Sequence, residues 1–264
     1  SLWAATQNIV RNPTFQAYSA LSTASFAGLF TFLATSAFVF TQSMALSKTM
    51  YGLLMFSMSL SYIVGTFGCR WLLLRISVQT CVFIAGFVSL TAGLLLMLVA
   101  YVGPGQSWFG AWAVMAPVNL YLLAHGVHQP CGQSGCVAPF PEMAGTASAL
   151  NGFTMMLVAF GMGTWIGTHM SDPLLALAHG LLLWSSCLVL FAWFTTTDVF
   201  QNLTNIDMKN MLYRERLQAI QDDMLPFGII SDGSDHHVQG VGDGEGNVWF
   251  EAEYERDPLN RRLV

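Results

Sequence analysis

The chain has 264 residues, of which 54% are hydrophobic and only 9% are charged, and its formal net charge is −5. A soluble domain carries about 25% charged residues because its surface must be solvated, so this composition excludes an ordinary soluble fold. The charge is also uneven: residues 1–200 hold four basic and three acidic residues, whereas residues 201–264 hold six and twelve. We therefore expect a membrane domain followed by an acidic tail.

Six apolar stretches are long enough to cross a hydrocarbon core about 30 Å thick, which takes roughly 20 helical residues. The sequence therefore predicts an all-α polytopic membrane protein, with a six-transmembrane-helix bundle over residues 15–200. Residues 1–14 are expected to form a cytoplasmic linker. The chain opens without Met, which we interpret as a sign that it is a fragment of a longer protein. The predicted spans are 15–40, 50–69, 77–102, 108–129, 145–168 and 173–194.

The basic residues between the spans predict the orientation. Arg11 precedes the first span, and Arg70 and Arg75 lie between the second and third, so all three fall on one side of the membrane. Lys48 falls on the other side. Basic residues are retained in the cytoplasm, so both termini are predicted to be cytoplasmic, with Arg70 and Arg75 in a cytoplasmic basic loop.

Two patterns predict how the spans pack. Helices in lipid approach closely where small residues recur every four positions, and such ridges predict a tightly packed bundle. Leucine is concentrated in spans 77–102 and 173–194, which we therefore expect to be the outer, lipid-facing helices. The ridges are Ala20, Ala24 and Gly28; Ser57, Ser61, Gly65 and Cys69; Ala85, Ser89 and Gly93; and Ala159, Gly163 and Gly167.

The stretch HQPCGQSGCVAPFPEMAGTASALNG, residues 128–152, raises the question of a special site. The gap between Cys131 and Cys136 is not the two-residue gap typical of zinc or redox motifs, and a disulfide is not expected in a reducing cytoplasm. We predict no metal site and no cofactor. Because Pro139 and Pro141 interrupt a helix, the stretch is interpreted as a joint between two helices, with Glu142 near the start of the second, where an anion is favoured.

The same stretch resembles the joint between the tenth and eleventh helices of bicyclomycin-resistance-type (Bcr/CflA) drug transporters of the major facilitator superfamily. The segments FAGLFTFLATSAFVF (26–40) and YGLLMFSMSLSYIVGT (51–66) are similar to the seventh and eighth helices of that family. The resemblance covers residues 1 to about 200. The matching joint residues are Pro139, Phe140, Pro141, Ala144, Gly145, Ala147, Ser148, Ala149, Leu150 and Gly152.

The resemblance implies that the six spans are helices seven to twelve, the C-terminal half of a twelve-helix exporter. It also implies that the seventh and tenth helices line the substrate cavity and that the ninth and twelfth face lipid. The first six helices, with the acidic residues that such exporters use for proton coupling, are then expected on a partner half outside this sequence.

Polar and aromatic residues in spans 15–40 and 108–129 are the candidates for a cavity that binds small amphipathic drugs. An ionisable group inside a membrane suggests a function; for His125, a titrating site and a helix–helix hydrogen bond are both open. Tyr121 and His125 are i, i+4 neighbours on one helix face, and Pro117 is expected to kink their helix. The cavity candidates are Ser22, Phe26, Phe30, Asn119, Tyr121 and His125.

The tail, residues 201–264, is predicted to be largely disordered and cytoplasmic. Residues 205–221 fit a short amphipathic helix, and residues 248–254 alternate like a strand. The segment 243–247 is rejected as a calcium site, because it lacks the required Gly and closing Glu of a calcium loop. The run Asp235, His236 and His237 suggests a metal site, but we interpret it as part of a solvated acidic linker.

The preferred function is therefore a drug/proton antiporter half in a bacterial inner membrane, with lipid, protons and a drug-like molecule as partners and no nucleic acid. The alternatives are a membrane anchor or scaffold for the acidic tail and an inactive truncated transporter. The sequence contains no metalloprotease motif, nucleophile elbow or pair of membrane-embedded Asp residues, so an enzyme is not expected.

Overall fold

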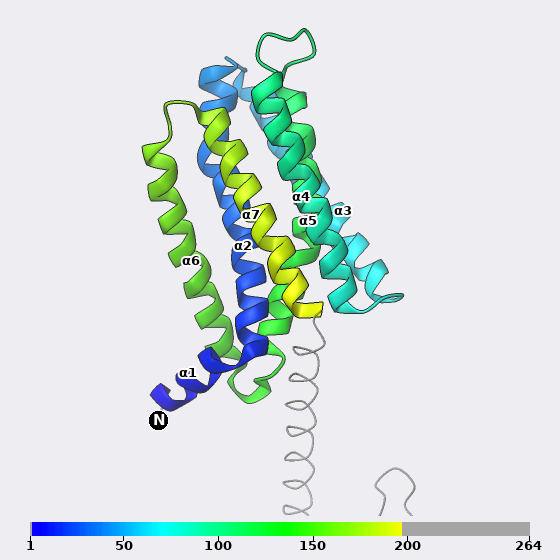
Figure 1. The fold of residues 1–264 in the computed structure, drawn as a ribbon, viewed down its shortest axis with the longest axis vertical. Coiled ribbons are helices and arrows are strands. Elements are labelled where there is room, and N and C mark those ends of the chain that lie inside the picture. Colours follow the sequence, from blue (N-terminus) through cyan, green and yellow to red (C-terminus); the bar gives the residue numbers. More distant parts are fainter. Residues whose placement is uncertain (1, 197–264) are drawn as a thin grey trace, which may run out of the picture. The chain divides into compact units, whose positions relative to one another are not determined.

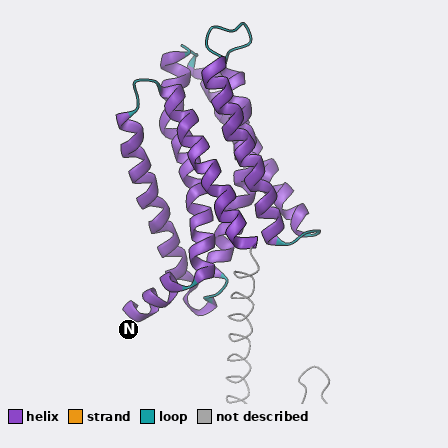
Figure 2. Ribbon diagram, in the orientation of Figure 1, coloured by secondary structure: helices purple, strands orange, loops and turns teal. Residues whose placement is uncertain are grey.

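The computed structural model describes residues 2–196, which belong to one compact unit, and the regular structure of these residues is entirely helical (Figure 2). The tail 201–264 lies outside the described residues, and with it the predicted helix 205–221 and the strand-like segment 248–254. The elements are α1 (Leu2–Arg11), α2 (Pro13–Ala37), the π-helical turn η1 (Phe38–Ser43), α3 (Lys48–Leu73), α4 (Val78–Val102), α5 (Ala111–Val137), the 3₁₀ turn η2 (Pro141–Met143), α6 (Ala144–Thr168) and α7 (Pro173–Thr196).

The six predicted spans correspond to helices α2 to α7 (Figure 1). Five of them are long and apolar enough to cross a membrane. The exception is α5. This helix has 27 residues, but polar side chains and the prolines Pro117 and Pro130 interrupt its apolar stretch. The helix continues through both prolines, as transmembrane helices with satisfied neighbouring backbone groups do. The predicted span 108–129 therefore ends eight residues too early, because the proline at position 130 does not stop the helix.

Short polar residues begin several of these helices. Asn12, Ser47 and Ser77 each accept a hydrogen bond from the backbone N–H three residues later, and the Asp172 carboxylate accepts one from Leu175 N at 3.0 Å. Such caps satisfy amide groups that have no partner within the helix. The expected linker 1–14 itself contains α1, which ends one residue before the Asn12 cap.

The joint predicted at residues 128–152 is much shorter than the stretch that suggested it. Both cysteines of that stretch belong to α5, and only residues 138–143 separate α5 from α6. Proline interrupts the helix here as predicted, and Glu142 lies in η2, directly before α6.

The six long helices form two groups of three along the chain, α2–α4 and α5–α7, and most helix–helix contacts join helices of different groups (Figure 1). The central helices α2 and α5 contact each other, and α4 contacts α7. Each central helix also packs against two helices of the other group: α2 against α6 and α7, and α5 against α3 and α4. Exchanging the two groups leaves these contacts unchanged, whereas the smaller α5–α6 and α3–α4 contacts have no counterpart of similar extent.

The chain direction is inverted between the groups. Ser22 lies beside Gly132 and Gly28 beside Tyr121, so α2 and α5 run antiparallel. Two hydrogen bonds are also equivalent when the two groups are exchanged. Ser19 of α2 bonds Asn151 of α6, and Asn119 of α5 bonds Ser57 of α3. Residues 2–196 therefore contain an inverted arrangement of two three-helix units.

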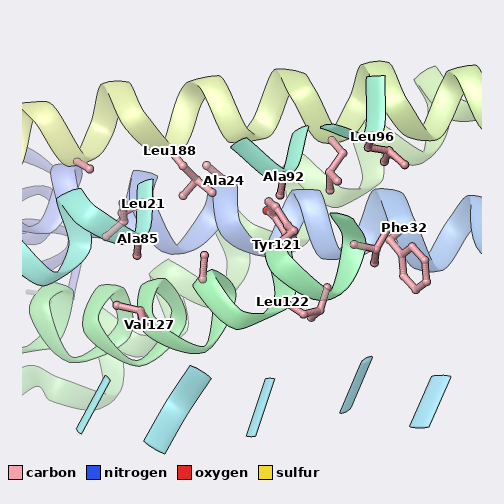
Figure 3. Packing of buried hydrophobic residues seen from close by; sticks show 14 of the residues in the cluster. Leu21, Ala24, Phe32, Ala85, Ala92, Leu96, Tyr121, Leu122, Val127 and Leu188 are labelled. Carbon is pink, nitrogen blue, oxygen red and sulfur yellow. The ribbon is translucent and has the colours of Figure 1, made fainter. Parts of the chain in front are cut away.

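Burial along the bundle contradicts the expectation from leucine content. In the most apolar window, 17% of α3 and 28% of α6 are buried, against 39% of α4 and 44% of α7. Within this chain, the most exposed helices are thus α3 and α6. Leucines such as Leu96, Leu181 and Leu188 are fully buried, because α4 and α7 pack against each other and against the central helices (Figure 3).

Candidate functional site

The polar centre of the bundle lies where α2 and α5 face each other. Ser25 Oγ is 2.6 Å from His125 Nδ1, and the Tyr121 hydroxyl donates to the Ser25 carbonyl at 3.0 Å. All three residues are buried. The His125 ring also packs against Tyr62 of α3, with ring centroids 5.5 Å apart. A buried hydrogen-bonded cluster therefore joins α2 and α5, and a ring contact with the partly buried Tyr62 adds α3.

The α2–α5 contact is close because glycines form part of it. Tyr121 extends from α5 toward α2 (Figure 3), where Gly28 leaves room for its ring, and a Cβ at that position would collide with the ring. Near the other end of the interface, a Cβ on Gly132 would lie 2.8 Å from Ser22 Cβ. Small residues thus bring the polar side chains of the two helices within hydrogen-bonding distance.

Asn151 links α6 to α2. Its side-chain oxygen accepts hydrogen bonds from Ser19 Oγ at 2.8 Å and Ser22 Oγ at 3.0 Å. Its amide group faces the Met155 sulfur at 3.7 Å, and Gln129 of α5 approaches the same sulfur at 4.0 Å. Asn151 is 3% exposed, and its two accepted bonds connect an outer helix to a central one.

A second polar bridge, at the equivalent place, joins α5 to α3. The Asn119 amide donates to Ser57 Oγ at 3.3 Å, while the Asn119 side-chain oxygen is buried without a partner. His128 is also incompletely paired: Nε2 lies 3.3 Å from the Val82 carbonyl, and Nδ1 has no partner. Unpaired buried polar atoms are costly, so α5 retains free hydrogen-bonding capacity inside the bundle.

The six predicted cavity residues divide into two groups. Ser22, Tyr121 and His125 are buried in helix–helix contacts, whereas Phe26, Phe30 and Asn119 are only partly buried. Tyr121 and His125 lie on one face of α5 as predicted, and their rings are stacked with centroids 6.5 Å apart. For His125, the observed bond to Ser25 is the helix–helix hydrogen bond that the sequence left open as one of two interpretations.

The predicted joint residues do not meet at one point. Gly145 and Gly152 of α6 have open space where a Cβ would lie, and Ser148 is exposed. Phe140 packs edge-on against Phe15 at the start of α2, with centroids 6.5 Å apart. Pro139, Pro141 and Ala144 lie in or close to η2, and Ala147, Ala149 and Leu150 lie in the first two turns of α6.

The predicted basic loop is shorter than expected: Arg70 lies in the last turn of α3, and only Arg75 lies in the connection to α4. Arg70 and Arg75 are exposed, and the Arg75 guanidinium lies 4.1 Å from the centre of the Trp71 ring. An Arg stacked on an aromatic face is a favourable cation–π arrangement.

Three cysteines approach one another where α3, α4 and α5 meet. Cys69 and Cys131 are buried free thiols whose sulfurs are 3.6 Å apart, and Cys81 lies beside Cys69. Among residues 2–196, no group of three His, Cys, Asp or Glu side chains could hold a metal ion.

Sequence reasoning missed Ser19, Ser25, Ser57 and Asn151, which complete the polar bridges. Asn151 lies between two motif residues, Leu150 and Gly152, and an Asn in an apolar helix is itself a signal of an inward-facing position. The serines carried no such signal, because Ser is common in membrane helices and often bonds its own backbone.

No protein-family model, no characterised protein and no solved structure matches this sequence. Fold and composition define a class: a helical protein with five helices able to cross a membrane and a sixth, polar one packed among them.

Proposed function

We propose that this chain is the C-terminal six-helix half of a proton-coupled drug exporter that works by alternating access, similar to Bcr/CflA transporters of the major facilitator superfamily. In this proposal α5 also crosses the membrane, as the fourth of six crossings, equivalent to the tenth helix of the full transporter.

The observation that carries the proposal is the inverted pairing of two three-helix units. Each half of a major facilitator transporter is built from such inverted three-helix repeats, with the substrate site near the middle of the membrane. Here the pair Ser25 and His125 joins the central helices of both units, which puts the main polar cluster at the interface between the repeats.

The polar content of α5 supports the same function. A helix that served only as an anchor would gain nothing from buried histidines and an unpartnered Asn119 oxygen, since polar groups in membranes are costly and usually functional. In the proposal Asn119, Phe26 and Phe30 contact the drug because they are only partly buried, while Ser22, Tyr121 and His125 hold the two central helices together.

Proton coupling is assigned mainly to the partner half. Residues 2–196 contain two acidic side chains, Glu142 and Asp172. Both are exposed and lie at helix starts. Neither is placed to carry a proton through the bundle. The proposed location is a bacterial inner membrane, with both termini in the cytoplasm.

The test is co-expression of this chain with the N-terminal six helices of a Bcr/CflA-type transporter, or their fusion in one chain, in drug-sensitive bacteria. We expect raised drug tolerance that disappears when the proton gradient is dissipated, and no tolerance from either half alone. Asn119→Ala and Phe30→Ala should change which drugs are exported at unchanged protein level. Correct insertion of both halves without export of any drug in a broad panel would favour the anchor function instead.

A further inference from the structure

The two outer helices, α3 and α6, are attached to the bundle in different ways. They occupy equivalent places, α3 against α5 and α6 against α2. Gly65 of α3 lies against the Leu123 backbone of α5, and a Cβ on Gly126 of α5 would lie 2.7 Å from the Thr66 nitrogen. Backbone therefore packs directly on backbone between α3 and α5, which leaves little freedom to separate or tilt.

None of the glycines of α6 makes such a contact with α2. Gly163 is the glycine of α6 nearest to another helix, and a Cβ there would meet only the Phe30 ring at 3.5 Å, an ordinary contact distance. The other α6 glycines have open space where a Cβ would lie. The open positions are Gly145, Gly152, Gly161 and Gly167.

Two methionines form part of the buried face of α6, together with Ala159 and Ile166. Met155 and Met162 are 6% and 5% exposed and lie on the inward face of α6. Methionine is unbranched and adapts to irregular gaps, so this layer can deform without losing contact. Figure 1 shows α6 at the edge of the bundle beside α2, away from α3 and α4.

Hydrogen bonds from α2 and α5 reach α6 in its first half, at Asn151 and, through a long contact to sulfur, at Met155. The bonds from Ser19 and Ser22 to Asn151 lie about two turns from the start of the helix at Ala144. Beyond them, the hydroxyls of Thr154, Thr164 and Thr168 bond carbonyls of α6 itself and not α2. Because helices in lipid gain little from hydrophobic burial against each other, these two bonds carry much of the orientation of α6.

We infer that α6 is a hinged helix, which pivots at Asn151 while residues 155–168 move away from α2 across the methionine layer. Its equivalent, α3, is fixed to α5 by glycine contacts and does not move in this way. The bundle is therefore symmetric in its connections but asymmetric in its mobility. This inference goes beyond the proposed function and does not depend on transport.

Hydrogen–deuterium exchange of the full 264-residue chain in lipid nanodiscs tests the hinge. Asn151→Leu removes both hydrogen bonds. Loss of one such bond in a membrane bundle changes the equilibrium constant for local opening about threefold. We expect exchange over residues 155–168 to rise about eightfold. Ser19→Ala removes one bond with little change of shape and should raise the same exchange about threefold, so the test survives if Asn151→Leu fails to fold.

The matched control is Asn119→Leu, which removes the equivalent bridge between α5 and α3. Exchange over residues 58–73 of α3 should then stay within about twofold of the unmodified chain, because Gly65 and Gly126 hold the two backbones together. Unchanged exchange of residues 155–168 in Ser19→Ala would overturn the inference. The inference would also be overturned if Asn119→Leu raised exchange over residues 58–73 of α3 as much as Asn151→Leu raises exchange over residues 155–168 of α6.

Discussion

Ser25 and His125 stand 100 residues apart in the chain, yet Ser25 Oγ lies 2.6 Å from His125 Nδ1 in the centre of the α2–α5 interface. The two residues come from the first helix of each three-helix unit. Because those helices run antiparallel, one short contact near their crossing joins both units at once.

The first prediction follows from this bond. In a double-mutant cycle of Ser25→Ala and His125→Ala, the coupling energy for unfolding should be about 0.6 kcal/mol and at most about 1.7 kcal/mol, the range for hydrogen bonds in membrane bundles. Thermal unfolding of the purified chain in detergent measures it. A coupling indistinguishable from zero would show that the two side chains do not bond in the membrane.

A second prediction concerns the close approach of α3 to α5. Gly65→Ala forces a methyl group onto the Leu123 backbone and should destabilise the bundle by about 1–3 kcal/mol, as overpacking does. Gly68→Ala, on the same helix with open space at its Cβ position, is the control and should be neutral or slightly stabilising. Equal effects from the two variants would contradict the close contact.

The third prediction uses Gly28 and Tyr121 as a pair. Gly28→Ala should destabilise the fold, because its new methyl group collides with the Tyr121 ring. Tyr121→Leu in the same chain removes the ring and should recover part of the loss, even though it gives up the bond to Ser25. The yield of monodisperse protein on size exclusion measures both effects. No recovery in the double variant would mean that the collision is not the cause.

A fourth prediction concerns the thiols at the meeting point of α3, α4 and α5. With their sulfurs 3.6 Å apart, Cys69 and Cys131 should form a disulfide when treated with hydrogen peroxide: two thiols lose two protons and two electrons, and one peroxide becomes two water molecules. Mass spectrometry of the digested chain should find the Cys69–Cys131 peptide and a loss of two free thiols. In Cys69→Ser that peptide cannot form, and its absence from the oxidised unmodified chain would contradict the observed proximity.

The last prediction tests orientation. A reporter fused after Arg75 should read as cytoplasmic, and one fused after Ala45 as external, since basic residues predict a cytoplasmic α3–α4 loop. The opposite pattern would reverse the orientation of the whole bundle, because consecutive spans alternate.

Sequence alone determined the helices that are long and apolar. Hydrophobic length is a local property that the bilayer thickness makes decisive, so five predicted spans agree with the structure to within a few residues at most of their ends. Proline at 139 and 141 marked the end of α5 correctly, since it lacks the N–H that a helix needs. Proline at 130 did not stop the helix, because packed neighbours can satisfy the carbonyl groups that it leaves free.

Only the tertiary structure decided which helices are central and which partners the polar residues meet. Leucine content predicted α4 and α7 on the outside, whereas within this chain they are more buried than α3 and α6. A leucine is equally suited to lipid and to a neighbouring helix, and its sequence context cannot tell the two apart. The small-residue ridges predicted close packing but not its location: Gly28, Gly65 and Gly93 lie in contacts, whereas Gly167 has open space around it. Likewise, Asn151 and Ser19 are 132 residues apart, and nothing local to either one specifies the other. Their bond exists because two inverted three-helix units pack against each other, and that arrangement depends on contacts along all six helices.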